Sequence, residues 1–251
     1  MQVDIYVNWR RLIMFDEMKR ATVAVAVFFI SSVLFMGCNS SQTESVDSNS
    51  APNSAPTQAA STSATAETAS TPPPAALANS SELAENVYDA VWQKDWKTAD
   101  AKFQQLQSNG SQMQQSSDAQ METGQLEKAL KARDRMGALR ASNELTNLFT
   151  SAMRPYQNKV PVDVMKLDYL GRRLQVDAGA KDMTSAKMTV QDLRHTWDNV
   201  RPEIIRNNGA AEASNFEALV TKMEKANSAQ ALSADAASEL AQVDKLEGVF
   251  K

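Results

Sequence analysis

The sequence predicts an all-α protein, an antiparallel bundle of about seven or eight helices that follows a disordered linker. Beyond Ser80, apolar residues recur three or four positions apart, which is the spacing of one helix face. No stretch there alternates apolar and polar residues between turn formers, so strands are not expected. From Asn39 to Ser80 the chain is almost entirely Ser, Thr, Ala, Pro, Asn and Gln. Such a segment cannot bury enough apolar surface to offset the entropy of ordering.

Helices of the domain 81–251 are predicted from these apolar rows and from the residues that bound them. The clearest helix runs from Asp182, which suits an N-cap, to about Val200, and Pro202 marks its end or a kink. A row from Ala138 to Ala152 predicts another helix, which Pro155 ends.

Pro161 suits the first turn of the next helix, whose apolar row consists of Val164, Leu167, Gly171 and Leu174. A glycine inside a helix costs about 1 kcal/mol relative to Ala. Gly171 therefore predicts a close approach of a neighbouring helix at that point. A further row from Leu232 to Phe250 predicts a last helix near the C-terminus.

Two segments resemble each other at a separation of 87 residues. Lys, Asp, Ala, Gln and Leu coincide between Lys94–Leu106 and Lys181–Leu193. The match predicts a duplication with halves 81–155 and 161–251, although convergent helix-start chemistry would explain part of it. Each half would contain a helix ending near the lysine, an aspartate-capped turn, a second helix, a polar connection and two further helices.

Cys38, the only cysteine, lies three residues after an apolar stretch of 15 residues, Ala21 to Phe35. This stretch follows Met18-Lys19-Arg20. A basic start, an apolar core and a small residue before the cleavage point are the parts of a signal peptide. Leu34-Phe35-Met36-Gly37-Cys38 resembles the lipobox of bacterial lipoproteins, with Phe and Met where Leu and a small residue are usual. The resemblance implies cleavage between Gly37 and Cys38 and a lipid, such as palmitate chains, on Cys38.

Two other interpretations of this stretch remain open: a chance cysteine beside an ordinary cleavage site, or a membrane-spanning helix. A span needs about 20 apolar residues, so 15 favour the signal peptide. Three acidic residues within 1–17 do not suit a signal peptide, and we expect residues 1–17 to be a mis-assigned start. The predicted organisation is then a signal peptide at 18–37, a lipid anchor and linker at 38–80, and the helical domain at 81–251.

The composition narrows the classes of function. Residues 81–251 carry a net charge of only −2, so no basic field for nucleic acid is expected. With its one cysteine lipidated, the domain would have no disulfide and no thiolate metal site. One histidine excludes an HExxH site, and neither a phosphate-binding GxxxxGK[ST] loop nor a GxSxG elbow is present. We therefore expect neither an enzyme nor a bound cofactor.

A few residues remain as candidates for a ligand or partner surface. His195 falls opposite the apolar row of its helix, which favours a surface histidine over a haem or metal ligand. Three tryptophans are many for this domain; core anchoring is favoured over a binding groove. They are Trp92, Trp96 and Trp197.

Asp168 and Arg172 are spaced for an i,i+4 ion pair. An ion-paired surface is favoured there over an anion site formed by Arg172 and Arg173 beside Tyr169. Taken together, the sequence predicts a non-enzymatic, lipid-anchored binding or scaffold module of the cell envelope. It would lie on the cell membrane or outer membrane, facing outside the cytoplasm, with an envelope protein as partner. The alternative is a carrier of a small ligand, metal or haem built into the bundle.

Overall fold

The computed structural model describes residues 71–109 and 116–251, and every regular element within them is a helix. The helices are α2 (Ala75–Trp92), α3 (Trp96–Ser108), α4 (Ser117–Ala132), α5 (Arg135–Ala152), α6 (Val162–Gly179), α7 (Met183–Arg206), α8 (Ala210–Lys225) and α9 (Ala229–Gly248). The all-α prediction is confirmed. The predicted signal peptide, Gly37, Cys38 and most of the linker lie outside the described residues.

The helical domain begins earlier than the linker composition predicts. Helix α2 starts at Ala75, whereas the sequence places the end of the linker at Ser80. The six residues 75–80 are rich in alanine, which is common in linkers but is also the strongest helix former. Pro74 precedes the first turn, where its missing N–H costs nothing. Ahead of it, the Gln157 N–H donates to the Thr71 carbonyl at 2.9 Å, so the chain is held to the α5–α6 connection.

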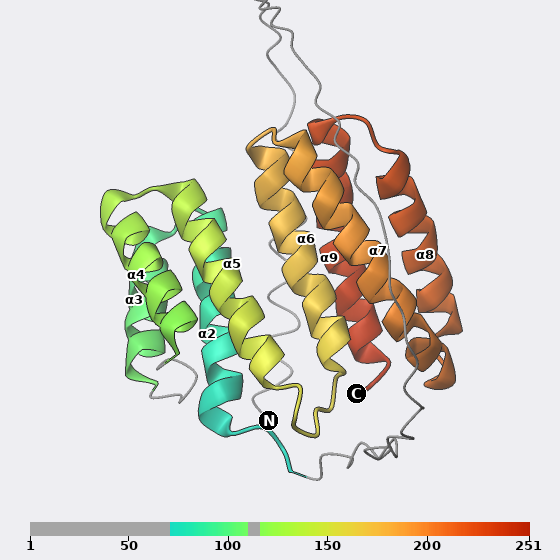
Figure 1. The fold of residues 1–251 in the computed structure, drawn as a ribbon, viewed down its shortest axis with the longest axis horizontal. Coiled ribbons are helices and arrows are strands. Elements are labelled where there is room, and N and C mark those ends of the chain that lie inside the picture. The colour runs from blue at the N-terminus through green and yellow to red at the C-terminus, as the bar shows by residue number, and fades with distance from the viewer. Residues whose placement is uncertain (1–70, 110–115) are drawn as a thin grey trace, which may run out of the picture. The chain divides into compact units, whose positions relative to one another are not determined.

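The helices form two halves, α2–α5 and α6–α9, which the α5–α6 connection joins. In each half the first helix packs against the second and the last, and the third lies beside the last. Figure 1 shows that consecutive helices run antiparallel. Each half encloses an apolar core, and the core of the first half also takes in Val162 and Val176 of α6. The halves meet where α5 packs against α6.

The first turn of each half follows the same backbone path. Lys94 and Lys181 adopt left-handed torsions, with φ of 62° and 59°. The next N–H groups, of Asp95 and Asp182, donate to carbonyls five residues earlier at 2.8 and 3.0 Å, which closes the preceding helix. The carboxylates of the same two residues accept the N–H three positions later, at 3.1 and 3.0 Å. Each aspartate thus ends one helix and caps the next.

Burial follows the same repeat. Each of the eight buried residues of α2 has a buried counterpart 87 positions later in α6, and the three of α3 have counterparts in α7. Helices α2 and α6 both have 18 residues, and α4 and α8 both have 16. The halves therefore share helix order, turn geometry and burial pattern, while their origin by duplication stays a prediction.

Two details differ from the sequence predictions. Pro202 lies inside α7, which continues to Arg206, so it does not end the helix. As a result α7 has 24 residues where its counterpart α3 has 13. Pro161 is the N-cap of α6 and not its first helical residue.

The close helix approach predicted at Gly171 is present between α6 and α9. A Cβ at Gly171 would overlap Oε2 of Glu239 and lie 2.8 Å from Cδ2 of Leu240. Glu239 is fully buried, and among the described residues neither of its carboxyl oxygens has a hydrogen-bond partner. Burial, together with the nearby charge of Asp168, raises the pKa of Glu239 well above its usual range, although Arg172 opposes the shift.

In the first half, Leu145 of α5 occupies the position that matches Glu239 of α9. The two residues are 94 positions apart, as are the buried pairs Ala138 and Leu232, and Phe149 and Val243. Glu239→Leu should therefore stabilise the chain, because it replaces a buried, unpartnered carboxyl with the side chain that the first half carries there. Because folding raises the pKa of Glu239, the wild-type chain loses stability as pH rises through that pKa. The increase in the free energy of unfolding caused by Glu239→Leu should therefore be larger at pH 8 than at pH 4, by about 1–3 kcal/mol.

Urea unfolding at the two pH values measures this difference. Glu82→Gln, a charge removal on the exposed face of α2, is the matched control and should change the free energy of unfolding by less than about 0.5 kcal/mol. Equal gains for Glu239→Leu at both pH values would contradict the prediction.

Candidate functional site

Arg172 is buried between the two halves, which corrects the expectation of a surface ion pair. Its side chain is 2% exposed. The predicted i,i+4 bond to Asp168 is present, and Nη2 lies 3.6 Å from Glu85 and Nε 3.9 Å from Asp89, both on α2. The guanidinium also lies 5.5 Å from the centroid of the Tyr88 ring. Burial disfavours the cation, but the three carboxylates outweigh it and raise the pKa of Arg172.

Tyr88 completes this contact between α2 and α6. Its hydroxyl lies 3.1 Å from both the Arg172 carbonyl and Oε1 of Gln175, and burial raises the pKa of the phenol. Tyr88 and Gln175 are 87 positions apart, and so are Glu85 and Arg172. Equivalent positions of the two halves thus contact each other directly, which excludes Arg172 from any open ligand surface.

Trp197 is a core residue of the second half. It is fully buried, and its ring centroid lies 4.6 Å from that of Phe216. The indole Nε1 donates to Oε2 of Glu217 at 2.8 Å. This bond, together with the bond from Arg194, lowers the pKa of Glu217. Trp197 therefore anchors the core, as favoured from the sequence, and is not part of a surface.

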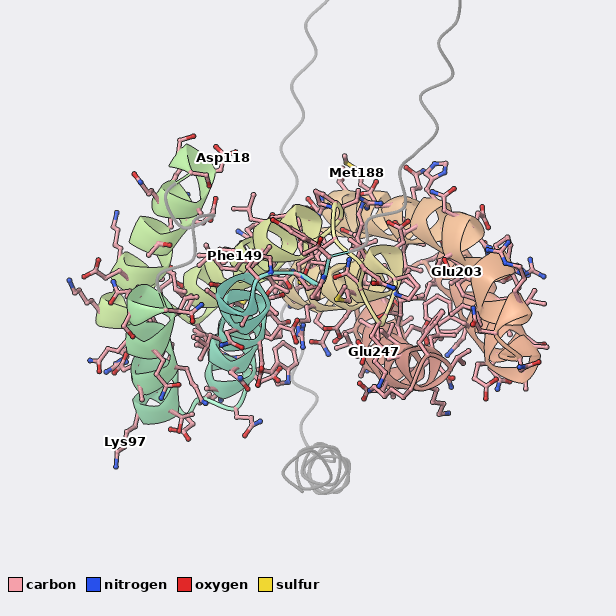
Figure 2. All side chains as sticks on the ribbon, turned by 90° about the horizontal axis from the view of Figure 1, so that it is seen from below. Lys97, Asp118, Phe149, Met188, Glu203 and Glu247 are labelled. Atoms are coloured by element: carbon pink, nitrogen blue, oxygen red, sulfur yellow. The ribbon has the colours of Figure 1, made fainter. Side chains whose placement is uncertain are left out.

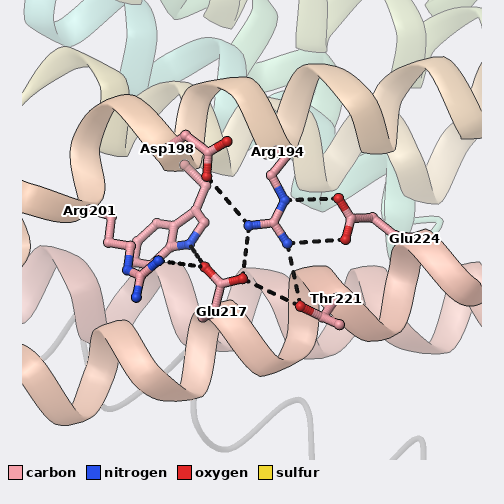
Figure 3. A network of polar contacts seen from close by, with 7 residues as sticks. Arg194, Asp198, Arg201, Glu217, Thr221 and Glu224 are labelled. Atoms are coloured by element: carbon pink, nitrogen blue, oxygen red, sulfur yellow. Dashed lines mark hydrogen bonds and ion pairs between the residues drawn. The ribbon is translucent and has the colours of Figure 1, made fainter.

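Arg194 is the centre of a polar network between α7 and α8 (Figure 3). It donates to both carboxylate oxygens of Glu224, at 2.8 and 3.1 Å, and to Glu217 at 2.9 Å. Arg201 adds a bond to Glu217 at 3.2 Å. The hydrogen bonds to these carboxylates, chiefly Glu224, raise the pKa of Arg194. Because these charged groups are paired with one another, the network joins the two helices and leaves few polar groups available to a ligand.

Arginines cover Trp92 and Trp96, both of which are partly buried. Trp92 stacks on Tyr88 with ring centroids 6.2 Å apart, and Arg135 lies 4.7 Å from its ring. Arg133 lies 5.4 Å from the ring of Trp96. Since α2 ends at Trp92 and α3 begins at Trp96, these residues do not share one helix face. Their aromatic faces are occupied by cations of the same chain.

His195 is exposed on α7, whereas a carrier that used it as a ligand would need it inside the bundle. Among residues 71–109 and 116–251, no three His, Cys, Asp or Glu side chains are grouped to hold a metal ion. Figure 2 shows Lys97 and Asp118 pointing outward on different helices, with Phe149 among the helices. Charge is thus spread over several helices.

A polar cleft of about 380 Å³ lies at the junction of the two halves. Helices α4 and α5 supply one wall, and α6 and the start of α7 supply the other. Its charged lining consists of two arginines and four acids: Arg140, Arg173, Glu122, Glu144, Asp177 and Asp182. The cleft combines residues that are distant in the sequence, so it depends on how the two halves pack.

Charges on the α6 wall are matched by neighbours. Arg173 lies 3.2 Å from Asp192 and 3.9 Å from Asp177. Asp177 also accepts a hydrogen bond from Thr189 at 2.8 Å, although burial still raises its pKa. Asp182 is the cap of α7, and the hydrogen bonds from Ser185 lower its pKa.

The α4–α5 wall is different. No ion pair joins Glu122 or Glu144 to a cation among the described residues. Burial and the nearby Glu144 raise the pKa of Glu122. The Tyr169 hydroxyl donates to Glu144 at 2.9 Å, while burial and this carboxylate raise the pKa of Tyr169. Asn143, only 2% exposed, donates from Nδ2 to the Tyr169 carbonyl at 3.1 Å, and its Oδ1 has no partner in the described chain.

Of the sequence candidates, only Arg173 lines this cleft, and Tyr169 lies behind its wall, in contact with Glu144 and Asn143. Sequence reasoning missed Asn143 and Glu144 because the apolar row of α5 assigns it a single buried face. The helix in fact packs against α2, α4 and α6, so its buried arc is wider. Ser142 and Asn143 lie within the apolar row, between Ala141 and Leu145, and this was the available signal, since buried polar residues are uncommon.

No protein-family model, no curated protein and no solved structure matches the chain. None of the helices in the described ranges is long and apolar enough to cross a membrane.

Arg172→Ala should lower the free energy of unfolding by about 3–5 kcal/mol, because it leaves the buried Asp168 without its cation. Urea or thermal unfolding measures the loss. The neighbouring Arg173→Ala removes a charge that is 31% exposed and should cost less than about 1 kcal/mol. Similar losses for the two variants would show that the burial of Arg172 does not govern stability.

Proposed function

We propose that the protein is a lipid-anchored, non-enzymatic helical binding module of the cell envelope, on the cell membrane or outer membrane and facing outside the cytoplasm. One observation carries the proposal: a signal-type segment that ends at Gly37-Cys38 precedes, by a polar linker, a helical domain that starts at Ala75. The signal-type segment supports export and anchoring, and the helical domain would provide the binding surface.

The linker composition supports a tether. Residues 39–70 remain between the anchor and Thr71, which Gln157 holds. A flexible chain of these 32 residues would have a root-mean-square reach of about 31 Å. The domain would then sample a shell around its anchor, within reach of an envelope protein or a small ligand.

The cleft is the proposed place of binding, and its position supports this role. Thr71, the last point before α2, is held by Gln157 in the α5–α6 connection. Arg140 in the cleft is 12 residues before Ala152, the end of α5 next to that connection, and so about 18 Å from it along the helix. The cleft therefore lies away from the end of the domain where the tether arrives.

A non-catalytic role is supported by the side chains at the cleft. They are carboxylates, arginines, amides and a serine, and Arg173, Asp177 and Asp182 are occupied in ion pairs or capping. Nucleophilic catalysis would need an activating base beside a nucleophile. Ser185 is instead hydrogen-bonded to the capping carboxylate of Asp182 at 2.8 Å.

Palmitate labelling tests the anchor. In bacterial cells given radioactive palmitate, the wild-type chain should take up label and remain with the membranes. Cys38→Ala should abolish the label and move the protein to the soluble fraction, since the cysteine sulfur is the attachment point. A Cys38→Ser variant is the conservative control and should behave like Cys38→Ala. An unlabelled wild type, or a Cys38→Ala variant that still takes up label, would contradict the proposal.

A further inference from the structure

We propose that the cleft at the junction of the two halves binds a small ligand through a primary ammonium group, which Glu122, Glu144 and Oδ1 of Asn143 accept. The proposal deepens the binding role proposed above and rests on it. It names the chemical class of the ligand and the part of the cleft that recognises it.

The three acceptors come from two adjacent helices and line one wall. Glu122 belongs to α4, and Asn143 and Glu144 are neighbours on α5. Tyr169 of α6 steadies both α5 residues: its hydroxyl donates to Glu144 and its carbonyl accepts from Asn143. The wall is thus preorganised by a residue that does not itself need to contact the ligand.

Asn143 supplies the observation that points to a donor ligand. With its Nδ2 committed to the Tyr169 carbonyl, the remaining polar atom of the side chain is Oδ1, which is buried and unpartnered. An unsatisfied buried acceptor costs about 1–3 kcal/mol. An ammonium group offers three N–H donors and can serve Oδ1 together with two carboxylates.

Charge on the lining favours a cation over an anion. Four carboxylates face two arginines in the cleft. Arg173 is already paired with Asp177 and Asp192. The lining carries a net charge of −2, and on the α4–α5 wall the two carboxylates Glu122 and Glu144 outnumber the one arginine, Arg140.

Size and ligand number favour an organic cation over a metal ion. Calcium takes six to eight oxygen ligands at about 2.3–2.6 Å, and within the described chain no three acidic side chains are close enough to serve one ion. A volume of about 380 Å³ is within the range of small-molecule sites. The cleft can hold a carbon chain behind the ammonium group.

Isothermal titration calorimetry on the full chain, purified in detergent, tests the proposal. Putrescine and butylamine are the probes, and butyrate is the control of the same length and opposite charge. We expect heat of binding for both amines and none for butyrate. Glycylglycinamide carries the amino terminus of a peptide instead of an alkylamine. If it binds, the ligand is a peptide that the cleft still recognises through its ammonium group.

Substitutions of the three acceptors test whether the amines bind in the cleft. Glu122→Gln and Glu144→Gln should each weaken amine binding about tenfold, the effect of one charged hydrogen bond. Asn143→Ala should weaken it by a similar factor. Glu127→Gln, on α4 but outside the cleft, is the matched control and should leave the dissociation constant within twofold. Circular dichroism establishes that each variant keeps its helices.

Three results would overturn the proposal: no heat with either amine at millimolar concentration, binding that Glu122→Gln and Glu144→Gln leave unchanged, or tighter binding of butyrate or calcium chloride than of the amines. Palmitate labelling is independent of these titrations. A labelled chain that binds no amine removes this inference alone, whereas an unlabelled chain that binds amines removes only the anchor.

Discussion

The burial of one guanidinium constrains the packing of the whole domain. A buried cation needs carboxylates or other acceptors around it, because otherwise the free-energy cost of removing it from water exceeds the energy gained from its ion pairs. Arg172 meets this requirement only where α2 and α6 lie together, because Asp168 comes from its own helix and Glu85 from the other half. The two halves are therefore held in one relative position, with Tyr88 filling the space beside the charge. The cleft follows from this position, since its walls belong to different halves.

The halves share one arrangement of helices and differ where the second half carries polar groups. Ala84 and Leu145 in the first half correspond to Gly171 and Glu239 in the second, so a buried carboxyl stands where an apolar side chain would pack. Helix α7 extends beyond the length of α3, and the added turns carry Arg201 next to the network of Arg194 and Glu217. The two halves therefore share an arrangement of helices but differ in the polarity of their interiors.

Local chemistry predicted most of the fold. Asp182 as a cap, the helix after Pro161 and the small residue at Gly171 all follow from rules that act within a few residues. The burial of Arg172 could not be predicted this way, because two of its three compensating charges, Glu85 and Asp89, come from a helix more than 80 residues earlier. For the same reason the cleft was not foreseen: Asn143 looks like an ordinary polar helix residue until the second half covers it. The end of α2 near Lys94 was predicted from the match with Lys181, and the left-handed torsion of Lys94 marks it without a glycine.

The hydrogen bond between Thr71 and Gln157 has a mechanical meaning. Any pull on the chain ahead of α2 is delivered to the α5–α6 connection as well as to the first turn of α2. A single backbone hydrogen bond contributes only about 0.5–1.5 kcal/mol, so under tension it would break before the helices separate. Its rupture would then leave the first turn of α2 to take the pull.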